Sequence, residues 1–294
     1  MERRADPALL ELDAVPLTYA ISDIHGGYDR LVALLLRHQL LRAAPPSPDQ
    51  AEWSAGRAVL VVTGDLFDSG PAGVEVLDLL RALQARASEA GGRVVVTLGN
   101  HEAEFLVSAN NKKATAQNGI STQLVTRGLQ PSEVAQGLEA RGRWLRALPF
   151  ATRIGRWFFS HAGDTHGRST AALSAALQQG VDLHDYDDAE IVGDTSLLQS
   201  ADWTSTDKTI GARYAQAAGA AHLVFGHNPS ALGTKGQIGH AQSGALFRID
   251  CGMSPDIDYS QGALLRVELL NGDEIAAALE SDGKVRELWR GPLP

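Results

Sequence analysis

Short runs of β-branched residues alternate with amphipathic helical patterns along the first third of the chain. The β-branched runs predict three strands, at residues 17–21, 58–63 and 93–98. Two stretches with apolar residues at helical spacing lie between them, at residues 29–41 and 71–90, and predict helices. Strands that alternate with helices favour βαβ units and a largely parallel sheet. The chain is therefore expected to have an α/β fold.

The rest of the chain has a different pattern. Residues 102–148 predict mostly helices, and residues 165–220 predict helices and loops. Residues 157–160 predict another strand, and the last third predicts successive strands at residues 223–225, 246–249, 263–269, 274–279 and 285–288. The simplest arrangement is one domain, 1–294, with two sheets and with helical or loop insertions at about 103–148 and 165–220.

Composition excludes several classes of protein. Hydrophobic residues make up 44% and charged residues 21%, which is typical of a folded globular chain. The net charge of −9 offers no long-range attraction to nucleic acid, so no nucleic-acid partner is expected. The longest apolar runs are too short to cross a bilayer, and the N-terminus has no signal-peptide pattern, so no membrane partner is expected. The single cysteine, Cys251, is expected to be buried and suits a reducing cytoplasm.

Five short polar segments each follow a predicted strand. They are SDIHGG at 22–27, GDLFDSG at 64–70, GNHE at 99–102, SHAG at 160–163 and FGHNP at 225–229. Ligands of open α/β sheets bind beyond the carboxyl ends of the strands. The five segments are therefore expected to converge in space, and their glycines allow sharp turns there.

These segments contain carboxylates, imidazoles and one amide oxygen. This collection suits Mn, Fe or Zn, and a carboxylate can bridge two ions because it has two oxygens. Taken singly, Asp23 or Asp65 is more often a helix cap, and His161 or His227 is more often a satisfied, partly buried group. Five such segments at five strand ends favour a metal site instead.

In this combination, the segments resemble the calcineurin-like metallophosphoesterase superfamily, and within it the phosphoprotein phosphatase type. The pattern of that type is GDxHG, GDxxDRG, GNHE, HxG and a later GH, and the resemblance spans residues 22–228. It implies two mixed β-sheets packed face to face and flanked by helices, a four-layer sandwich. It also implies two metal ions, whose identity among Mn, Fe and Zn stays open.

The resemblance assigns a role to each matching residue. Asp23 and His25 would bind the first metal, and Asp65 would bridge both. Asn100, His161 and His227 would complete the second metal site. His101 would be the general acid, oriented by Asp68. Pro229 stands where many members of the superfamily have a further metal-binding histidine. The phosphoprotein phosphatase and diadenosine tetraphosphatase branches also lack that histidine.

One position departs from the pattern. Ser69 occupies the place of the arginine in GDxxDRG, which normally holds the phosphate. Either another cation compensates for it, or phosphate binding is weaker. The candidates are Arg213, upstream of the GH segment, and the pair Lys112 and Lys113, downstream of GNHE. Each of them has a simpler interpretation as an exposed, solvated side chain.

The expected chemistry is in-line attack on phosphorus by a water that bridges the two metals. Three functions remain open. The first is a phosphomonoesterase of phosphoprotein phosphatase type, acting on a phosphorylated protein or a small phosphate ester. The second is a hydrolase of dinucleoside polyphosphates or another phosphoanhydride. The third is a non-catalytic binding protein, which the complete set of ligands disfavours.

Overall fold

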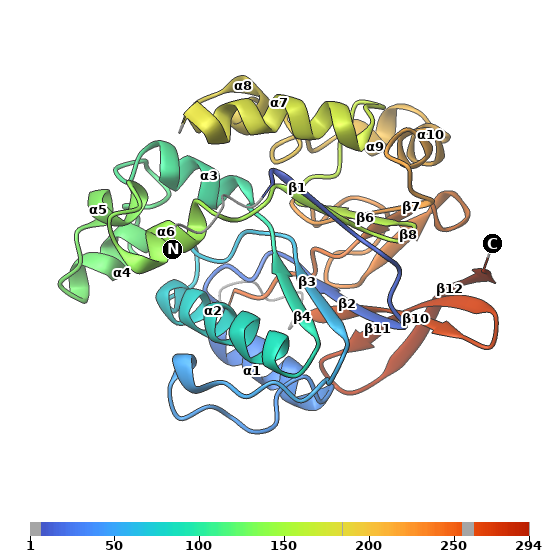
Figure 1. The fold of residues 1–294 in the computed structure, drawn as a ribbon, viewed down its shortest axis with the longest axis horizontal. Helices are drawn as coiled ribbons and strands as arrows, with labels where there is room; N and C mark the ends of the chain where they lie inside the picture. The colour runs from blue at the N-terminus through green and yellow to red at the C-terminus, as the bar shows by residue number, and fades with distance from the viewer. Residues whose placement is uncertain (1–6, 184, 255–261, 294) are drawn as a thin grey trace.

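Two mixed six-stranded β-sheets pack face to face in a computed structural model that describes residues 7–183, 185–254 and 262–293 (Figure 1). One sheet has the order β12 (Val285–Pro292), β11 (Asp273–Glu280), β10 (Ala263–Leu270), β2 (Leu17–Ile21), β3 (Val59–Val62) and β4 (Arg93–Val96). The other has the order β1 (Leu9–Leu12), β5 (Ala151–Ile154), β6 (Trp157–Ser160), β7 (His222–Phe225), β9 (Leu246–Arg248) and β8 (Gly239–Ala241). The predicted two-sheet α/β class is confirmed.

Alternation along the central strands explains why both faces of a sheet are buried. On β3, Val59 and Val61 point into the core between the sheets, together with Phe159 and Phe247 of the other sheet. Leu60 and Val62 belong instead to the second apolar core, which includes the buried leucines of the flanking helices. These helices are α1 (Tyr28–Arg37) and α2 (Gly73–Glu89). The period of two along a strand thus builds two cores from one run of apolar residues.

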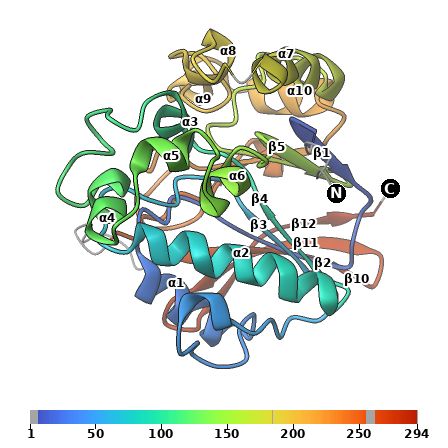
Figure 2. The same cartoon turned by 60° about the vertical axis from the view of Figure 1, so that its left-hand side comes forward.

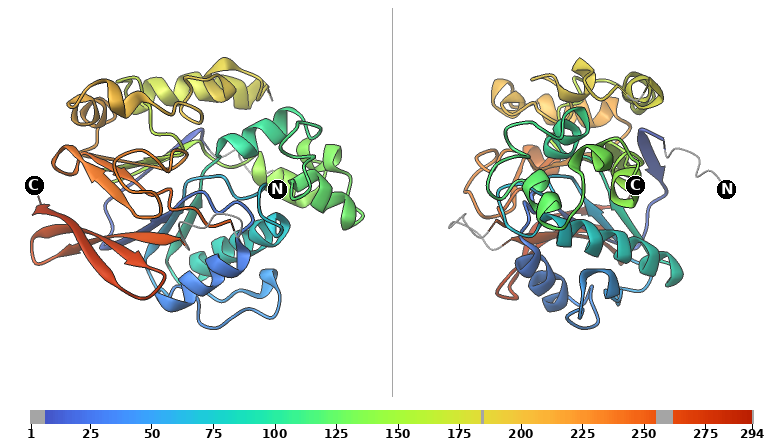
Figure 3. Two further views of the ribbon diagram at one scale, coloured as in Figure 1. Left: turned by 180° about the vertical axis from the view of Figure 1, so that it is seen from behind. Right: turned by 90° about the vertical axis from the view of Figure 1, so that its left-hand side faces the viewer.

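Helices form the outer layers of the sandwich. Figures 2 and 3 show α1 and α2 on one side, and on the other a layer made of α7 (Thr170–Leu183), α8 (Ala189–Val192), α9 (Trp203–Thr206) and α10 (Ile210–Ala217). Between β4 and β5 lie α3 (Asn100–Val107), α4 (Ile120–Thr126), α5 (Pro131–Ala135) and α6 (Ala140–Leu145). Two short 3-10 turns, Pro48–Gln50 and Gln242–Gly244, complete the described elements. None of the described helices is long and apolar enough to cross a membrane.

The strand pairings place the five polar segments at one end of the sandwich. Strands β2, β3 and β4 are parallel neighbours, as are β6 and β7 in the other sheet. Each of these five strands is followed by one of the segments predicted to bind metal. Parallel strands end at the same edge of a sheet, so the topology gathers residues that are up to 204 positions apart in the sequence.

The structure adds elements that the sequence patterns did not indicate. These are the strands β1, β5 and β8, all in the second sheet. Helix α1 ends at Arg37, before the predicted end at residue 41, because Gln39 has a left-handed backbone with φ 61°. Cys251 is buried, as expected, and burial raises the pKa of its thiol. It follows β9 rather than lying within a strand.

Candidate metal centre

The loops after β2 and β3 are joined by backbone hydrogen bonds, and the loop after β4 packs against them. The amides of His25 and Gly26 donate to the carbonyls of Asp65 (2.8 Å) and Leu66 (2.9 Å). Where the next loop crosses, a Cβ on Gly64 would lie 2.2 Å from the Gly99 nitrogen. Only glycine allows so close an approach, which explains its presence before Asp65.

Glu102 fixes the loop that carries Asp65. Its carboxylate is fully buried and accepts hydrogen bonds from the amides of Asp65 (2.8 Å), Leu66 (2.8 Å) and Gly99 (2.9 Å). Burial and the nearby Asp65 carboxylate raise the pKa of Glu102 to about 7, whereas these amide donors favour the ionised form. Glu102 is the last residue of the GNHE segment, but the sequence alone did not indicate that its carboxylate would hold the Asp65 loop in place.

Many residues at this end of the sandwich have an unusual backbone. In the described chain, twelve non-glycine residues have positive φ, and six of these lie in the polar segments: Asp23, His25, Asp65, Asp68, Ser69 and His227. A left-handed backbone costs about 1–2 kcal/mol for an L residue, and such conformations concentrate at functional sites. At this site the left-handed backbone turns candidate ligands toward one another immediately after their strands.

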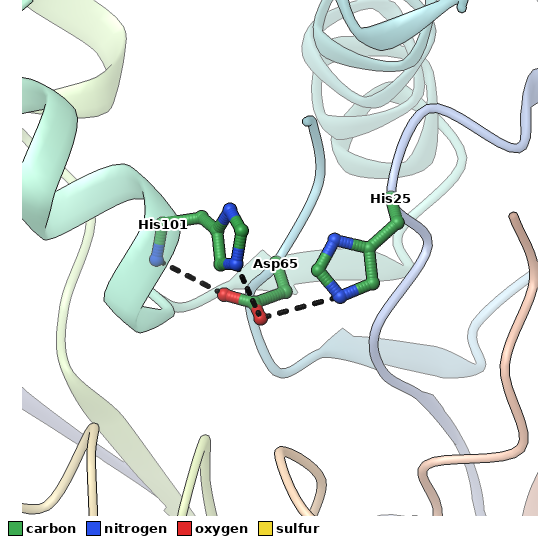
Figure 4. A group of neighbouring side chains, drawn as sticks. All are labelled: His25, Asp65 and His101. Carbon is green, nitrogen blue, oxygen red and sulfur yellow. Dashed lines mark hydrogen bonds and ion pairs between the residues drawn. The ribbon is translucent and has the colours of Figure 1, made fainter. Parts of the chain in front are cut away.

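Asp65 lies at the middle of the cluster, and each of its oxygens faces a different histidine. Oδ2 is 3.5 Å from Nε2 of His25, and Oδ1 is 3.4 Å from Nε2 of His161 (Figure 4 shows His25 with Asp65). Burial opposes ionisation of Asp65, but the surrounding imidazoles, His161 first, hold its pKa well below the usual carboxyl value. Two oxygens that face opposite ways are what a bridging ligand requires.

The hydrogen bonds of the two histidines direct their free nitrogens toward Asp65. Nδ1 of His161 lies 2.8 Å from the Thr63 carbonyl, and Nδ1 of His25 lies 3.2 Å from the Phe67 carbonyl. A carbonyl only accepts, so Nδ1 carries the proton in both rings, and each Nε2 presents a lone pair when the imidazole is neutral, as it is in a metal ligand. Metal-binding histidines are commonly oriented by such second hydrogen bonds.

Asn100 gives the clearest sign that a cation belongs here. Its side-chain oxygen lies 2.9 Å from Nε2 of His161 and close to Nδ1 of His227 and to the Asp65 oxygens, which are all acceptor atoms when the two imidazoles are neutral at these nitrogens. Turning the amide would give these atoms a donor, but would point the oxygen away from them and toward Lys113. Several lone pairs that converge on one point without a proton between them fit a metal ion.

Two groups of potential ligands have atoms within 4.8 Å of one another. One contains His25, Asp65 and His101, and the other contains Asp65, His161 and His227. Both include Asp65, as a shared bridging carboxylate would. His101 stands in the first group, where the sequence placed Asp23 as a ligand. Asp23 is buried beside this cluster, and its carboxylate accepts from the His227 amide at 3.1–3.2 Å.

His101 and Asp68 form a pair next to the cluster. Nδ1 of His101 lies 2.9 Å from Oδ2 of Asp68, whose other oxygen accepts from the Ile120 amide at 2.7 Å. Burial lowers the pKa of His101, but Asp65 and Asp68 outweigh it and raise that pKa to about 9. A cation on Asp65 would offset part of this effect, whereas the Asp68 hydrogen bond would remain.

The three basic candidates for phosphate binding occupy different surroundings. Arg213 lies on α10, pairs with Asp207 at 3.3 Å and is mostly exposed. Lys112 is exposed and makes no hydrogen bond or ion pair with the described residues. Lys113 contacts Glu104 at 2.7 Å and lies 3.0 Å from the outer end of the Asn100 amide. Ser69 is exposed on its loop, and its carbonyl accepts from Asn118.

The fold and the cluster together define an α/β protein with a candidate two-metal centre at the ends of its strands. The sequence profile of calcineurin-like phosphoesterases matches residues 17–250, which is most of the chain. The protein therefore belongs to the calcineurin-like phosphoesterase family, and the resemblance drawn from the sequence segments is confirmed.

Two curated relatives match parts of the chain. A symmetrical bis(5'-nucleosyl)-tetraphosphatase of Cronobacter sakazakii is 32% identical over 150 residues, 50% of this chain and 43% of that protein. An uncharacterized protein of Schizosaccharomyces pombe is 40% identical over 86 residues, 29% of this chain and 25% of its own length. The matches thus cover less than half of each relative.

Two solved structures resemble the whole fold. A cold-active protein-tyrosine phosphatase of a psychrophilic Shewanella species has a TM-score of 0.74 and 21% identity, and the match covers 95% of this chain and 82% of that one. A protein serine/threonine phosphatase of Saccharomyces cerevisiae has a TM-score of 0.61 and 15% identity, with 98% and 86% covered. At these identities the likeness establishes the fold alone.

Proposed function

We propose that this protein hydrolyses phosphate monoesters at a centre of two metal ions bridged by Asp65. The observation that carries the proposal is the convergence of lone pairs on both sides of that carboxylate, with Nε2 of His25 on one side and Nε2 of His161 and the Asn100 oxygen on the other. The substrate class is a phosphorylated protein or a small phosphate ester.

Bound ions would offset the charge of the phosphate and make the attacking water acidic enough to ionise near neutral pH. The other tasks fall to the side chains of the chain itself. His101 would give a proton to the leaving oxygen, since an alkoxide is a poor leaving group without one. Asp68 would keep the ring of His101 charged and correctly oriented, through the 2.9 Å contact to Nδ1.

The donor set limits the metals without selecting one. Imidazole nitrogens, carboxylates and an amide oxygen suit Mn, Fe or Zn, and these are the ions that we propose. We also propose a cytoplasmic location, supported by the single cysteine, which forms no disulfide within the chain. Neither a nucleic acid nor a membrane is expected as a partner.

A second function has one specific observation in its favour. The match to the Cronobacter tetraphosphatase is 32% identical over half of this chain. Hydrolysis of a dinucleoside polyphosphate would use the same two-metal chemistry on a phosphoanhydride rather than an ester. A non-catalytic role, the third possibility, is disfavoured because the described site has the predicted imidazole, carboxylate and amide groups gathered in one place.

A substrate panel separates these functions. The purified protein would be stripped of metal, reconstituted with Mn²⁺, Fe²⁺ or Zn²⁺ in turn, and assayed on p-nitrophenyl phosphate, phosphotyrosine and phosphoserine peptides, and diadenosine tetraphosphate. We expect the highest kcat/KM on a phosphomonoester. A higher kcat/KM on diadenosine tetraphosphate would favour the second function, and no turnover with any metal would contradict both.

The Ser69 position gives a prediction about phosphate affinity. Ser69 is exposed and offers one neutral hydroxyl, whereas an arginine would offer a charged fork of donors. We expect Ser69→Arg to lower the inhibition constant of inorganic phosphate about tenfold, since charge-assisted hydrogen bonds contribute about 1.5–3 kcal/mol.

The same inhibition assay would include Arg213→Ala. This variant removes an arginine side chain that pairs with Asp207 on the outer helical layer. We expect that variant to bind phosphate as the wild type does. If Ser69→Arg left the constant unchanged while Arg213→Ala raised it strongly, Arg213 would already be the phosphate-binding cation.

A further inference from the structure

Lys113 is held at the edge of the metal centre by its surroundings. It lies in the segment between α3 and α4. There the Asn111 side chain donates a hydrogen bond to the Ser108 carbonyl and accepts one from the Ala114 amide, both at 2.9 Å. The Ala114 carbonyl in turn accepts from the Ser121 amide at 2.9 Å. The backbone on both sides of Lys113 is therefore fixed, which directs a side chain that is 42% exposed.

The tip of Lys113 lies beside two residues on one face of α3. Asn100 and Glu104 are four positions apart in that helix, so their side chains are neighbours. Nζ of Lys113 donates to Oε1 of Glu104 at 2.7 Å and lies 3.0 Å from the outer, NH2 end of the Asn100 amide, which donates to the same carboxylate oxygen. The inner end of the same amide is the candidate metal ligand, so the ammonium lies one amide group away from the metal centre.

Glu104 connects Lys113 with the helical layer above it. Its Oε1 also accepts from Nε2 of Gln199 at 2.9 Å and from the Asn100 amide at 3.3 Å. Gln199 lies in the 165–220 segment. The Glu104 carboxylate thus joins both inserted segments at the metal centre.

We propose that Lys113 supplies the phosphate-binding cation that the Ser69 position lacks, and that Glu104 positions it. This inference rests on the proposed phosphatase function. An ammonium has three donors, and one bond to Glu104 leaves others for a phosphoryl oxygen bound beside Asn100. Of the three basic candidates from the sequence, Lys113 is the one that shares a hydrogen-bond acceptor, Glu104, with a predicted metal ligand, whereas Arg213 pairs with Asp207 and Lys112 is solvated.

The test measures binding of inorganic phosphate to the Mn²⁺-reconstituted protein by calorimetry, which needs no turnover. Lys113→Met removes the charge at similar length, Lys113→Arg keeps it, and Lys112→Met is the matched control. We expect Lys113→Met to weaken binding about tenfold or more, and Lys113→Arg to retain most of the affinity. Lys112→Met should stay within about twofold of wild type, and all variants should keep the wild-type metal content and melting temperature.

The role of Glu104 is tested by a double-mutant cycle in the same assay. Glu104→Gln removes a negative charge, which by itself would strengthen phosphate binding. It also replaces the ion pair that positions Lys113 with a weaker, neutral hydrogen bond. We expect a several-fold weakening when Lys113 is present, and no weakening in the Lys113→Met background. Tighter phosphate binding by Glu104→Gln in the wild-type background would contradict the positioning role.

The outcomes keep this inference separate from the proposed function. If Lys113→Met binds phosphate as Lys112→Met does, or if it loses metal, Lys113 is not the phosphate-binding cation, whatever the enzyme hydrolyses. If the wild type binds phosphate through Lys113 but hydrolyses no ester or anhydride, the binding site stands and the proposed catalytic function is wrong.

Discussion

Asp65→Ala is expected to abolish phosphatase activity and to lower the metal content below that of Asn100→Ala. Asp65 presents one oxygen toward His25 and the other toward His161, so its loss affects both ions, whereas Asn100 serves one side of the cluster. Elemental analysis of the purified, reconstituted variants measures the difference. We expect less than one ion per chain in Asp65→Ala and an intermediate content in Asn100→Ala.

Both variants keep the fold-determining backbone bonds, because Glu102 holds the Asp65 loop through amides. A circular dichroism spectrum and melting temperature therefore provide the control for misfolding. Full and equal metal occupancy in the two folded variants would reject Asp65 as the bridge.

His101→Asn is expected to keep both ions but to lose about 10²–10⁴-fold in kcat on an alkyl phosphate. The loss should be much smaller on p-nitrophenyl phosphate, because p-nitrophenolate leaves without a proton. Steady-state kinetics on the two substrates measure this. Equal losses on both would mean that His101 positions the phosphate rather than protonating the leaving group.

The metal content of His101→Asn decides a second question. Nε2 of His101 is 3.9 Å from Oδ2 of Asp65, near enough for the ring to be counted with the possible ligands. Loss of an ion from this variant would make His101 a ligand and would remove the general-acid assignment.

Asp68→Asn should resemble His101→Asn, because an amide cannot stabilise the charged imidazole as a carboxylate does. The side-chain oxygen of the new residue could still accept from the Ile120 amide, which keeps the loop in place. The double variant should be little slower than either single one, since paired residues that act as one unit are not additive. Multiplied losses would show that the two residues act independently.

The sequence predicted those parts of the fold that depend on local pattern. The strand at residues 17–21 matches β2 in the structure, and the alternation of strands with helices gave the parallel neighbours β2, β3 and β4. The missed strands β1 and β8 lie at the two edges of the second sheet. Pairing with a distant strand stabilises them, as when β1 aligns with β5 in parallel, and no local pattern reports such a partner.

The candidate ligands could be selected from the sequence because five segments at five strand ends must meet. The residues that position these ligands could not be selected in this way. Glu104 and Gln199 are 95 positions apart, and their hydrogen bond exists only because the two inserted segments meet. Likewise, adjacent lysines look alike in sequence, and only the fold of the 108–121 segment shows that Lys113 points toward Asn100.

Anomalous diffraction from crystals of the Mn²⁺-reconstituted protein tests the two-metal centre most directly. We predict two peaks about 3.5–4 Å apart, one on each side of the Asp65 carboxylate. One should lie near His25, and the other should lie among Asn100, His161 and His227. A single peak, or a pair of peaks that Asp65 does not bridge, would contradict the account.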